Sequence, residues 1–277
     1  MQRPFEGDSL YETVDFSLSE LTHHYGKNVH ILSDPFLLSH LATLCSAQTT
    51  QPIINQLVEE IYSNMVKTIL NHEFPRKLES LPTRMSAYHP REGIFRGEVL
   101  DRSQKAVSVN LARAGTFPSH ICYSALNYVL NPEAVRQDHI SLNRQTNDQE
   151  QVVGTQVAGQ KIGGSVKDAI VIFPDPMGAT GGTIVSALNI YKKNVQGPAR
   201  KYVALHLIVT PEYLKRVLSA HPDLIIYAVR LDRGLSDPSV LKTVPGSLWD
   251  QERGLNEKQY IVPGGGGFGE ILNNSFV

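Results

Sequence analysis

The 277-residue chain has few of the features that mark secreted, metal-holding or membrane-spanning proteins. Its two cysteines, Cys45 and Cys122, lie far apart in sequence, and its ten histidines lack the local spacings of zinc ligands. No run of eighteen apolar residues occurs, and residues 1–16 lack the apolar core of a signal peptide. We therefore expect a soluble protein of the reducing cytoplasm that holds no metal directly.

Strong charge of either sign is also missing. The formal net charge is −1, and the sequence contains no basic tract and no low-complexity tail. We therefore expect neither nucleic acid nor a membrane surface as a partner, and favour small-molecule ligands. With 41% hydrophobic residues, the chain can form one large domain or two small ones, each with its own core.

The most informative stretch is residues 168–183, DAIVIFPDPMGATGGT. Its apolar run, 169–173, is short and rich in β-branched residues, as in a strand buried on both faces of a parallel sheet. Asp175 would stand at the carboxyl end of this strand, before a glycine-rich turn. Apolar residues at helical spacing follow, so the sequence predicts a helix that begins near Gly182.

A strand, a glycine-rich turn and a helix in this order predict a phosphate site. The first amides of the helix lack intrahelical partners and carry partial positive charge, and Thr180 and Thr183 add hydroxyl donors. A P-loop would need a lysine where Gly182 stands, so nucleoside triphosphate binding in that manner is not expected. The alternative interpretation is an ordinary strand-to-helix turn.

The surrounding sequence predicts an α/β fold. Between residues 105 and 230, apolar runs alternate with helical patterns, which is typical of a mostly parallel sheet with helices on both faces. The runs expected to be strands are 106–112, 139–142, 169–173, 202–209 and 224–229, and further helices are expected near 118–130 and 211–220. Right-handed crossovers would bring the functional loops to one edge of the sheet.

The flanking segments have less regular patterns. Residues 1–30 are polar and irregular, whereas helices are expected from Asp34 to Leu44, with Asp34 as N-cap, and over 51–71. Residues 72–104 predict loops or short ribbons that cover the core. Residues 145–166 predict a protruding hairpin arm used in subunit contact, and a disordered surface loop is an equal alternative.

Two arginines follow predicted strands. Arg113 and the flexible backbone at Gly115 come after the first strand, and Arg144 follows run 139–142. The planar guanidinium matches the geometry of phosphate oxygens. We therefore expect the two arginines and the turn before Gly182 to bind a ligand that is phosphorylated at two places.

The glycine-rich segment 260–271 is the last distinctive motif. Gly264, Gly266 and Gly269 have the spacing of a dinucleotide fingerprint, but too few residues follow to supply the required helix and strand. Apolar residues at both ends, including Phe268, anchor the segment. We interpret it as a turn whose backbone contacts a flat ligand, with a floppy tail as the alternative.

Four segments together resemble uracil phosphoribosyltransferases, which have the type I phosphoribosyltransferase fold: ArgAlaGly at 113–115, the strand end at Arg144, AspProMetGlyAlaThrGlyGlyThr at 175–183 and TyrIleValProGly at 260–264. The similarity begins near residues 33–40 and extends to Gly269. Its most specific part is 175–183, where Pro176 stands at a position that carries a second acidic residue in most relatives of this fold.

The resemblance implies a fold and a domain plan. The expected fold is a mostly parallel central sheet with helices on both faces, a hairpin arm and a small hood formed by the N-terminal and C-terminal segments. An extension at 1–30 would precede a single domain at 31–277, with an insertion near 231–253. A homodimer or higher homo-oligomer is also expected.

The resemblance also implies roles for individual residues. Arg113 and Arg144 would meet the pyrophosphate of phosphoribosyl diphosphate. Main-chain groups of the terminal turn would bind uracil, at Ile261, Gly266, Gly267 and Phe268, with Gly267 also near the sugar. The ribose hydroxyls and the 5′-phosphate would be held by Asp175, Pro176, Met177, Gly178, Ala179, Thr180, Gly181, Gly182 and Thr183.

The implied reaction is transfer of the phosphoribosyl group to uracil, which gives uridine monophosphate and pyrophosphate. Magnesium would be carried mainly by the diphosphate, no acid or base is assigned, and Asp175 would stabilise the transition state. The chain is a divergent member, because Gly267 stands where the family usually has Asp and the residues after Arg144 differ. A different acceptor base, a non-catalytic regulator that binds the donor or a nucleotide, and a purely structural role are the alternatives.

Overall fold

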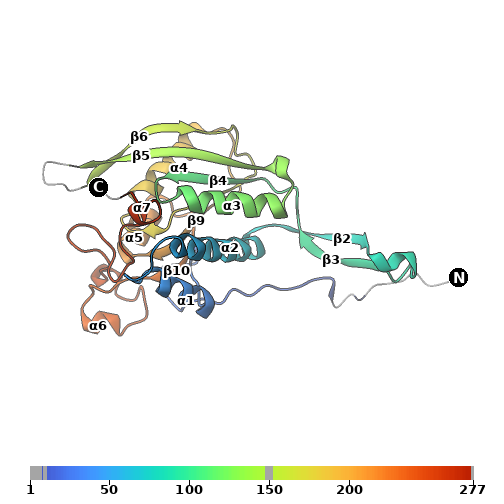
Figure 1. The fold of residues 1–277 in the computed structure, drawn as a ribbon, viewed down its shortest axis with the longest axis horizontal. Coiled ribbons are helices and arrows are strands. Elements are labelled where there is room, and N and C mark those ends of the chain that lie inside the picture. Colours follow the sequence, from blue (N-terminus) through green and yellow to red (C-terminus); the bar gives the residue numbers. More distant parts are fainter. Residues whose placement is uncertain (1–7, 9–10, 147–151, 276–277) are drawn as a thin grey trace.

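The computed structural model describes Asp8 and residues 11–146 and 152–275, and its centre is one mostly parallel sheet. In spatial order the sheet runs β1, β10, β9, β7, β4, β5, β6, and the short β8 pairs with β9. Figure 1 labels β4, β5, β6, β9 and β10 of this sheet. The strands are β1 Val29–Ile31, β4 Ala106–Ala112, β5 Val135–Thr146, β6 Val152–Lys161, β7 Ile170–Pro174, β8 Met177–Gly178, β9 Lys201–Val209 and β10 Ile225–Leu231.

The strand order creates a switch point between β4 and β7. From β4 the chain crosses over to β5 on one side, and β7 then pairs with β4 on the other side, with Val107 beside Val171. Ligands of open α/β sheets bind where crossovers diverge in this way, beyond the carboxyl ends of the strands. All five residues of β7 are buried, as its continuous apolar run predicts for a strand covered on both faces.

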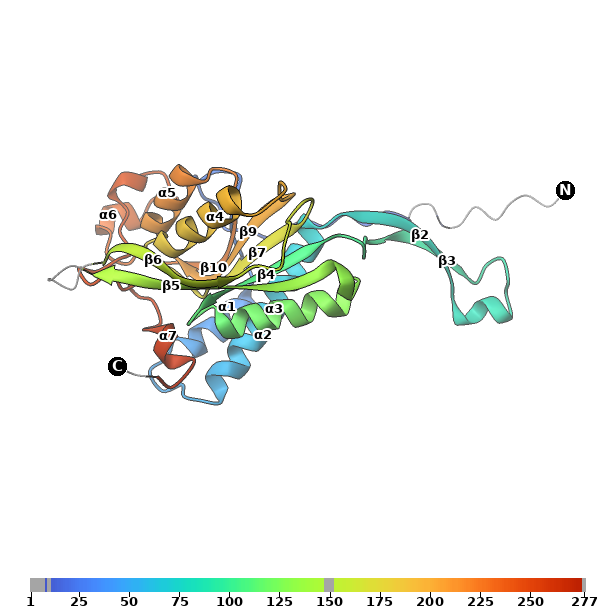
Figure 2. The same ribbon diagram turned by 90° about the horizontal axis from the view of Figure 1, so that it is seen from above.

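Helices cover both faces of the sheet, which confirms the predicted fold class (Figure 2). One face carries α1 Pro35–Leu44, α2 Ile53–Glu73 and α3 Thr116–Val129, and the other carries α4 Gly182–Asn194 and α5 Pro211–Ala220. The shorter helices are α6 Pro238–Leu241, α7 Phe268–Ile271, η2 Arg84–Ala87, η3 Pro132–Ala134 and η4 Trp249–Gln251. In the part of the chain that the structure describes, no helix is long and apolar enough to cross a membrane.

The predicted start of α1 is confirmed in detail. Asp34 has extended backbone angles, and its carboxylate accepts a hydrogen bond from the amide of Leu37 at 3.1 Å. Pro35 occupies the first turn, where its missing N–H removes no helical hydrogen bond. This capping fixes the helix at the edge of a core that it shares with α2 and α7.

A long hairpin forms where an arm was predicted. Strands β5 and β6 pair in antiparallel orientation from His139 to Thr146 (Figure 1). Strand β5 is longer than the predicted run 139–142. Its parallel pairing with β4 stops at Ser141, and its antiparallel pairing with β6 continues beyond that residue. Arg144 therefore lies within the arm, not directly after a strand end. The residues 147–151, and the side chains of 143–157, lie outside the description.

A second ribbon corrects the expectation for residues 72–104. Strands β2 Arg76–Pro82 and β3 Ile94–Leu100 form a two-stranded sheet that pairs with no other strand of the described residues. This ribbon projects away from the central sheet instead of covering its core (Figures 1 and 2). The cross-strand partners Leu81 and Phe95 are 47% and 43% exposed. Packing of these two side chains against the rest of the chain therefore does not stabilise the position of the ribbon.

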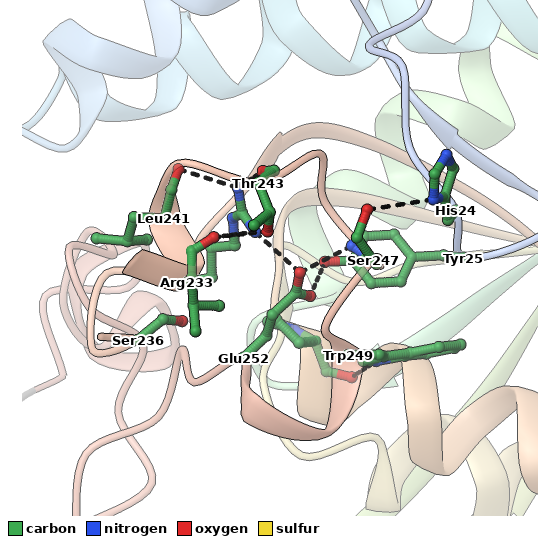
Figure 3. Close-up of polar contacts among 12 residues, drawn as sticks. His24, Tyr25, Arg233, Ser236, Leu241, Thr243, Ser247, Trp249 and Glu252 are labelled. Atoms are coloured by element: carbon green, nitrogen blue, oxygen red, sulfur yellow. Dashed lines mark hydrogen bonds and ion pairs between the residues drawn. The ribbon is translucent and has the colours of Figure 1, made fainter. Parts of the chain in front are cut away.

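Residues 231–253, which the sequence predicts to be an insertion, fold against the N-terminal segment. The carboxylate of Glu252 is fully buried and accepts hydrogen bonds from Arg233 and from the amide of Gly246, each at 2.8 Å. It also accepts from the hydroxyl of Tyr25 (Figure 3). The N-terminal segment also differs from the expected irregular extension, because Val29 and His30 already belong to β1.

Candidate active site

A cleft of about 1330 Å³ opens at the carboxyl edge of the sheet, at the switch point between β4 and β7. Three walls enclose it: the β4–α3 turn at 111–115, the segment 175–184, and the C-terminal segment 257–270. Ser141 and Leu142 of β5 close the remaining side. The loops that the sequence predicted at one edge therefore do converge.

Strand β9 supports the turn between β7 and α4 through backbone hydrogen bonds. The amide of Asp175 donates to the carbonyl of Leu205 at 3.0 Å, and β8 then pairs with β9. Thr210 completes the support, because its hydroxyl donates to the carbonyl of Ala179 at 2.7 Å and its amide to that of Gly178 at 3.1 Å. The backbone of this turn is thus fixed before any ligand binds.

Gly181 ends the turn with a conformation that favours glycine. It is the N-cap of α4 with φ of 78°, and a Cβ placed there would lie 2.6 Å from Cγ2 of Val217. In the described part of the chain, the amides of Gly181, Gly182 and Thr183 donate to no acceptor outside the helix. The strand, the glycine turn and the helix start that the sequence predicted are therefore present, and anion binding by these amides stays a prediction.

A buried histidine supports Asp175 from beneath. His206 has no exposed surface, its Nδ1 lies 2.5 Å from the carbonyl oxygen of Asp175, and its Nε2 lies 2.5 Å from the hydroxyl of Tyr213. Burial lowers the pKa of His206 to about 4. The ring is therefore neutral, donating from Nδ1 to the carbonyl and accepting at Nε2 from Tyr213.

Arg113 extends into the cleft from the turn after β4. Its side chain is 65% exposed, and its Nη2 lies 3.6 Å from Oε1 of Glu270. The turn is tight because a Cβ at Gly115 would lie 2.6 Å from the carbonyl oxygen of Leu111 and 2.9 Å from that of Pro174. Gly115 therefore brings Arg113 close to the end of β7, as predicted.

The C-terminal turn is anchored on both sides. Ile261 and Phe268 are buried in the core shared with α1 and α2. Between them lies Gly264, whose amide donates to the carboxylate of Asp232 at 2.7 Å and whose carbonyl accepts from Arg230 at 2.9 Å. The segment is therefore a held turn and not a floppy tail.

Most of the predicted site residues share this cleft. The predicted residues that line it are Arg113, Asp175, Met177, Ala179, Thr180, Gly181, Thr183, Ile261, Gly266, Gly267 and Phe268. Pro176, Gly178 and Gly182 are not among the lining residues, and the first two support the turn. The carbonyl of Pro176 accepts from the amides of Leu207 and Ile208, and Gly178 packs against Val209. The Arg144 side chain lies outside the description.

Sequence reasoning missed four charged residues at the site, of which Glu257 and Lys258 line the cleft in its C-terminal wall. Arg216 of α5 lies against the start of α4, with Nη1 3.4 Å from the carbonyl oxygen of Thr180. Glu270 lines the cleft beside Arg113. Arg216 carries no motif that would reveal it, whereas Glu270 lies within the distinctive 260–271 segment and could have been assigned from its position.

The chemistry of the lining is that of binding and charge stabilisation. Among the described lining residues, the charged groups are three carboxylates, Arg113 and Lys258, and neither histidine nor cysteine occurs. The carboxylates belong to Asp175, Glu257 and Glu270, and their oxygens are donors that suit Mg²⁺.

A separate cluster of possible metal ligands lies at the opposite edge of the sheet. Ligand atoms of His30, His72 and Glu73 lie within 4.8 Å of one another. The Glu73 carboxylate is already paired with Lys201 at 2.7 Å, and it accepts from the hydroxyl of Tyr227 at 2.5 Å. Because these partners satisfy the carboxylate, we assign the cluster a structural role.

A mostly parallel sheet with helices on both faces and a cleft at the carboxyl ends of its strands is the architecture that the resemblance to phosphoribosyltransferases of the type I fold implies. The profile of the family described as UPRTase, uracil phosphoribosyltransferase, matches residues 31–250. The chain therefore belongs to the uracil phosphoribosyltransferase family.

Individual relatives agree with this assignment. The uracil phosphoribosyltransferase of Dictyoglomus thermophilum is 29% identical over 245 residues, covering 88% of this chain and 98% of that protein. That of Thermococcus kodakarensis is 36% identical over 84 residues, which are 30% of this chain and only 36% of that protein. The AQ2163 protein from Aquifex aeolicus has a similar fold, with a TM-score of 0.65 and 23% identity over 90% of this chain and 99% of that one.

Proposed function

We propose that this protein transfers the phosphoribosyl group of phosphoribosyl diphosphate to uracil, which gives uridine monophosphate and pyrophosphate. The observation that carries the proposal is the start of α4, where amides with no acceptor outside the helix among the described residues lie at a cleft that Arg113 also lines. Family membership supports the phosphoribosyl donor, and the relatives named uracil phosphoribosyltransferase support uracil as the acceptor.

The donor would bind with its two phosphorylated ends at separate walls. The 5′-phosphate would accept hydrogen bonds from the amides at 181–183 and from the hydroxyls of Thr180 and Thr183. Asp175 would contact the ribose hydroxyls. The pyrophosphate would pair with the guanidinium of Arg113, and with Arg144 from the β5–β6 arm.

The acceptor would be recognised by main-chain groups. Backbone amides and carbonyls of Ile261, Gly266 and Phe268 can pair with the polar edge of a flat base, with Gly267 beside the sugar. Arg230 and Asp232 both hydrogen-bond to the backbone of Gly264 and so fix the C-terminal turn. The main-chain groups that would bind the base are therefore preorganised.

The reaction needs no nucleophile from the protein. N1 of uracil attacks the anomeric carbon, the bond from that carbon to the diphosphate breaks, and the N1 proton passes to solvent. Asp175 favours the positive charge that grows on the sugar, and Arg113 favours the negative charge on the leaving group. Alignment of two bound reactants contributes up to about 7–11 kcal/mol in well-oriented cases. Magnesium, carried mainly by the diphosphate, supplies further neutralisation of its charge when bound.

The direct test is to mix the protein with uracil, magnesium and phosphoribosyl diphosphate and to measure uridine monophosphate and pyrophosphate. We expect both products in equal amounts. A panel of pyrimidine and purine bases serves as the control for the acceptor. Product from another base with none from uracil would reassign the acceptor, and no product from any base would contradict the proposed reaction.

A non-catalytic regulator is the second candidate, and Gly267 is the observation that favours it. At this position the family usually has an aspartate, whereas glycine supplies no side-chain carboxylate of its own. Calorimetry that shows donor or nucleotide binding, together with no turnover of any base, would support a regulator. Ready turnover would exclude it.

We also propose that the protein acts as a homodimer or higher homo-oligomer in the cytoplasm. The exposed apolar side chains of the β2–β3 ribbon support association between copies. Cys45 and Cys122 are free thiols, which suits a reducing compartment.

A further inference from the structure

Glu270 is a carboxylate that pairs with Arg113, the cationic residue of the proposed diphosphate site. Its side chain is 27% exposed and lines the cleft, with Oε1 3.6 Å from Nη2 of Arg113. Its Oε2 lies 2.4 Å from the point where a Cβ at residue 267 would stand. The carboxylate therefore occupies space that is available only because residue 267 is glycine.

The backbone that carries Glu270 is fixed by its neighbours. Phe268 and Leu272 are 2% and 5% exposed and belong to the core shared with α1 and α2. Gln51, two residues before α2, also contacts this turn, since its Nε2 donates to the carbonyls of Ile271 and Leu272 at 3.3 and 3.2 Å. The turn that carries the Glu270 carboxylate is therefore fixed. Among the described residues, the ion pair of this carboxylate is the 3.6 Å contact with Arg113.

Charge decides what this carboxylate can do once a diphosphate is bound. Arg113 turns its guanidinium to the diphosphate in the proposed complex, which leaves Glu270 beside a second group of negative charge. Two such groups repel each other unless a divalent cation lies between them. Carboxylate oxygens and phosphate oxygens are the ligands that Mg²⁺ combines in proteins.

We propose that Glu270 is a donor-site residue that ligates the divalent cation carried by the diphosphate, in the space left by Gly267. The inference rests on the proposed function, because it needs a diphosphate at Arg113. It departs from the expectation from the sequence, in which no side chain of the protein holds the metal.

The test is the thermodynamic coupling between magnesium and inorganic pyrophosphate, measured by calorimetry with the full-length wild-type chain and with Glu270→Gln. Without magnesium, we expect Glu270→Gln to bind pyrophosphate as tightly as wild type or more tightly, since a competitor for Arg113 has been removed. Magnesium should raise the affinity for pyrophosphate in both chains, and we expect the increase to be about tenfold or more larger in wild type than in Glu270→Gln.

Two glycine variants provide a matched control. Gly267→Ala has backbone angles of −85° and 91° that alanine adopts, but its methyl carbon displaces the Glu270 carboxylate, so the magnesium gain should shrink. Gly269→Ala adds a methyl carbon 3.8 Å from Arg113, an ordinary contact, and should keep the gain. Thermal unfolding of all variants checks that they fold.

Equal magnesium gains in wild type and Glu270→Gln would overturn the inference while leaving the proposed function intact. The same conclusion would follow if Gly269→Ala lost the gain as fully as Gly267→Ala. If wild type bound neither pyrophosphate nor phosphoribosyl diphosphate, with or without magnesium, the proposed function would fail together with this role of Glu270.

Discussion

Arg113 is the residue on which the affinity for the diphosphate should depend most. Hydrogen bonds to charged groups contribute about 1.5–3 kcal/mol, so we expect Arg113→Ala to weaken binding of phosphoribosyl diphosphate by tenfold or more in calorimetry. Arg113→Lys should recover only part of the affinity, because lysine keeps the charge but loses the planar fork. Arg84→Ala, on η2 at the end of the ribbon, is the control. Wild-type affinity in Arg113→Ala would place the diphosphate elsewhere.

His206 should make stability depend on pH. The neutral ring is buried with a pKa of about 4, below the usual value of 6.5, so between these values the unfolded chain binds a proton that the folded chain does not. The contribution is therefore fully present above pH 6.5 and is lost as the pH falls toward 4. We expect the free energy of unfolding in urea to decrease from pH 7.5 to pH 5.

The matched variants for this prediction are His206→Gln and His89→Gln. The first should reduce the dependence on pH, and the second, which changes an exposed histidine on the ribbon, should leave it as in wild type. An unchanged slope in His206→Gln would show that other groups cause the loss of stability in acid.

The turn before α4 is the element whose shape the proposed function requires. Gly181→Ala places a side chain at φ of 78° and 2.6 Å from Val217, so we expect a loss of about 1–2 kcal/mol in the free energy of unfolding. It should also weaken the binding of ribose 5-phosphate, because the amides at the start of the helix move. Gly159→Ala, which meets no atom within 4 Å, is the control. Ribose 5-phosphate binding at wild-type strength in Gly181→Ala would separate the turn from the ligand.

Elements with local signals could be predicted from the sequence. The apolar run at 169–173 gave β7, and the cap at Asp34 gave α1, because each depends on residues close in sequence. The length of β5 could not be predicted, since it depends on pairing with β6 beyond the end of β4. Residues 72–104 were predicted as loops or short ribbons that cover the core, and the projection of the ribbon away from the core was not predicted, because the pattern of each strand does not show where the pair lies.

The candidate site divides in the same way. Arg113 and Asp175 follow strands that carry their own signals, and parallel pairing brings the two ends together. Arg216 and His206 could not be assigned, because their relation to the site depends on contacts between α5 or β9 and the turn before α4.

At the scale of the whole molecule, the β2–β3 ribbon is the surface through which we propose that copies of the chain associate. Leu81 and Phe95 are cross-strand partners with exposed side chains, so replacing both by lysine should disturb a contact between chains and leave the domain folded. We expect sedimentation velocity to show a smaller species for the double variant than for wild type. Tyr128→Lys, at an exposed apolar residue of α3, is the control. An unchanged species in the double variant would exclude the ribbon from the contact.

The bond from Tyr25 to Glu252 has a practical consequence for anyone who shortens this protein. The two residues are 227 positions apart, and both lie outside the 31–250 region that the family profile matches. A version trimmed to that region would lose the first two residues of the edge strand β1, the Tyr25–Glu252 contact and the terminal turn at once. The boundaries of sequence similarity are therefore narrower than those of the unit that folds, and expression should begin upstream of Tyr25 and continue past Leu272.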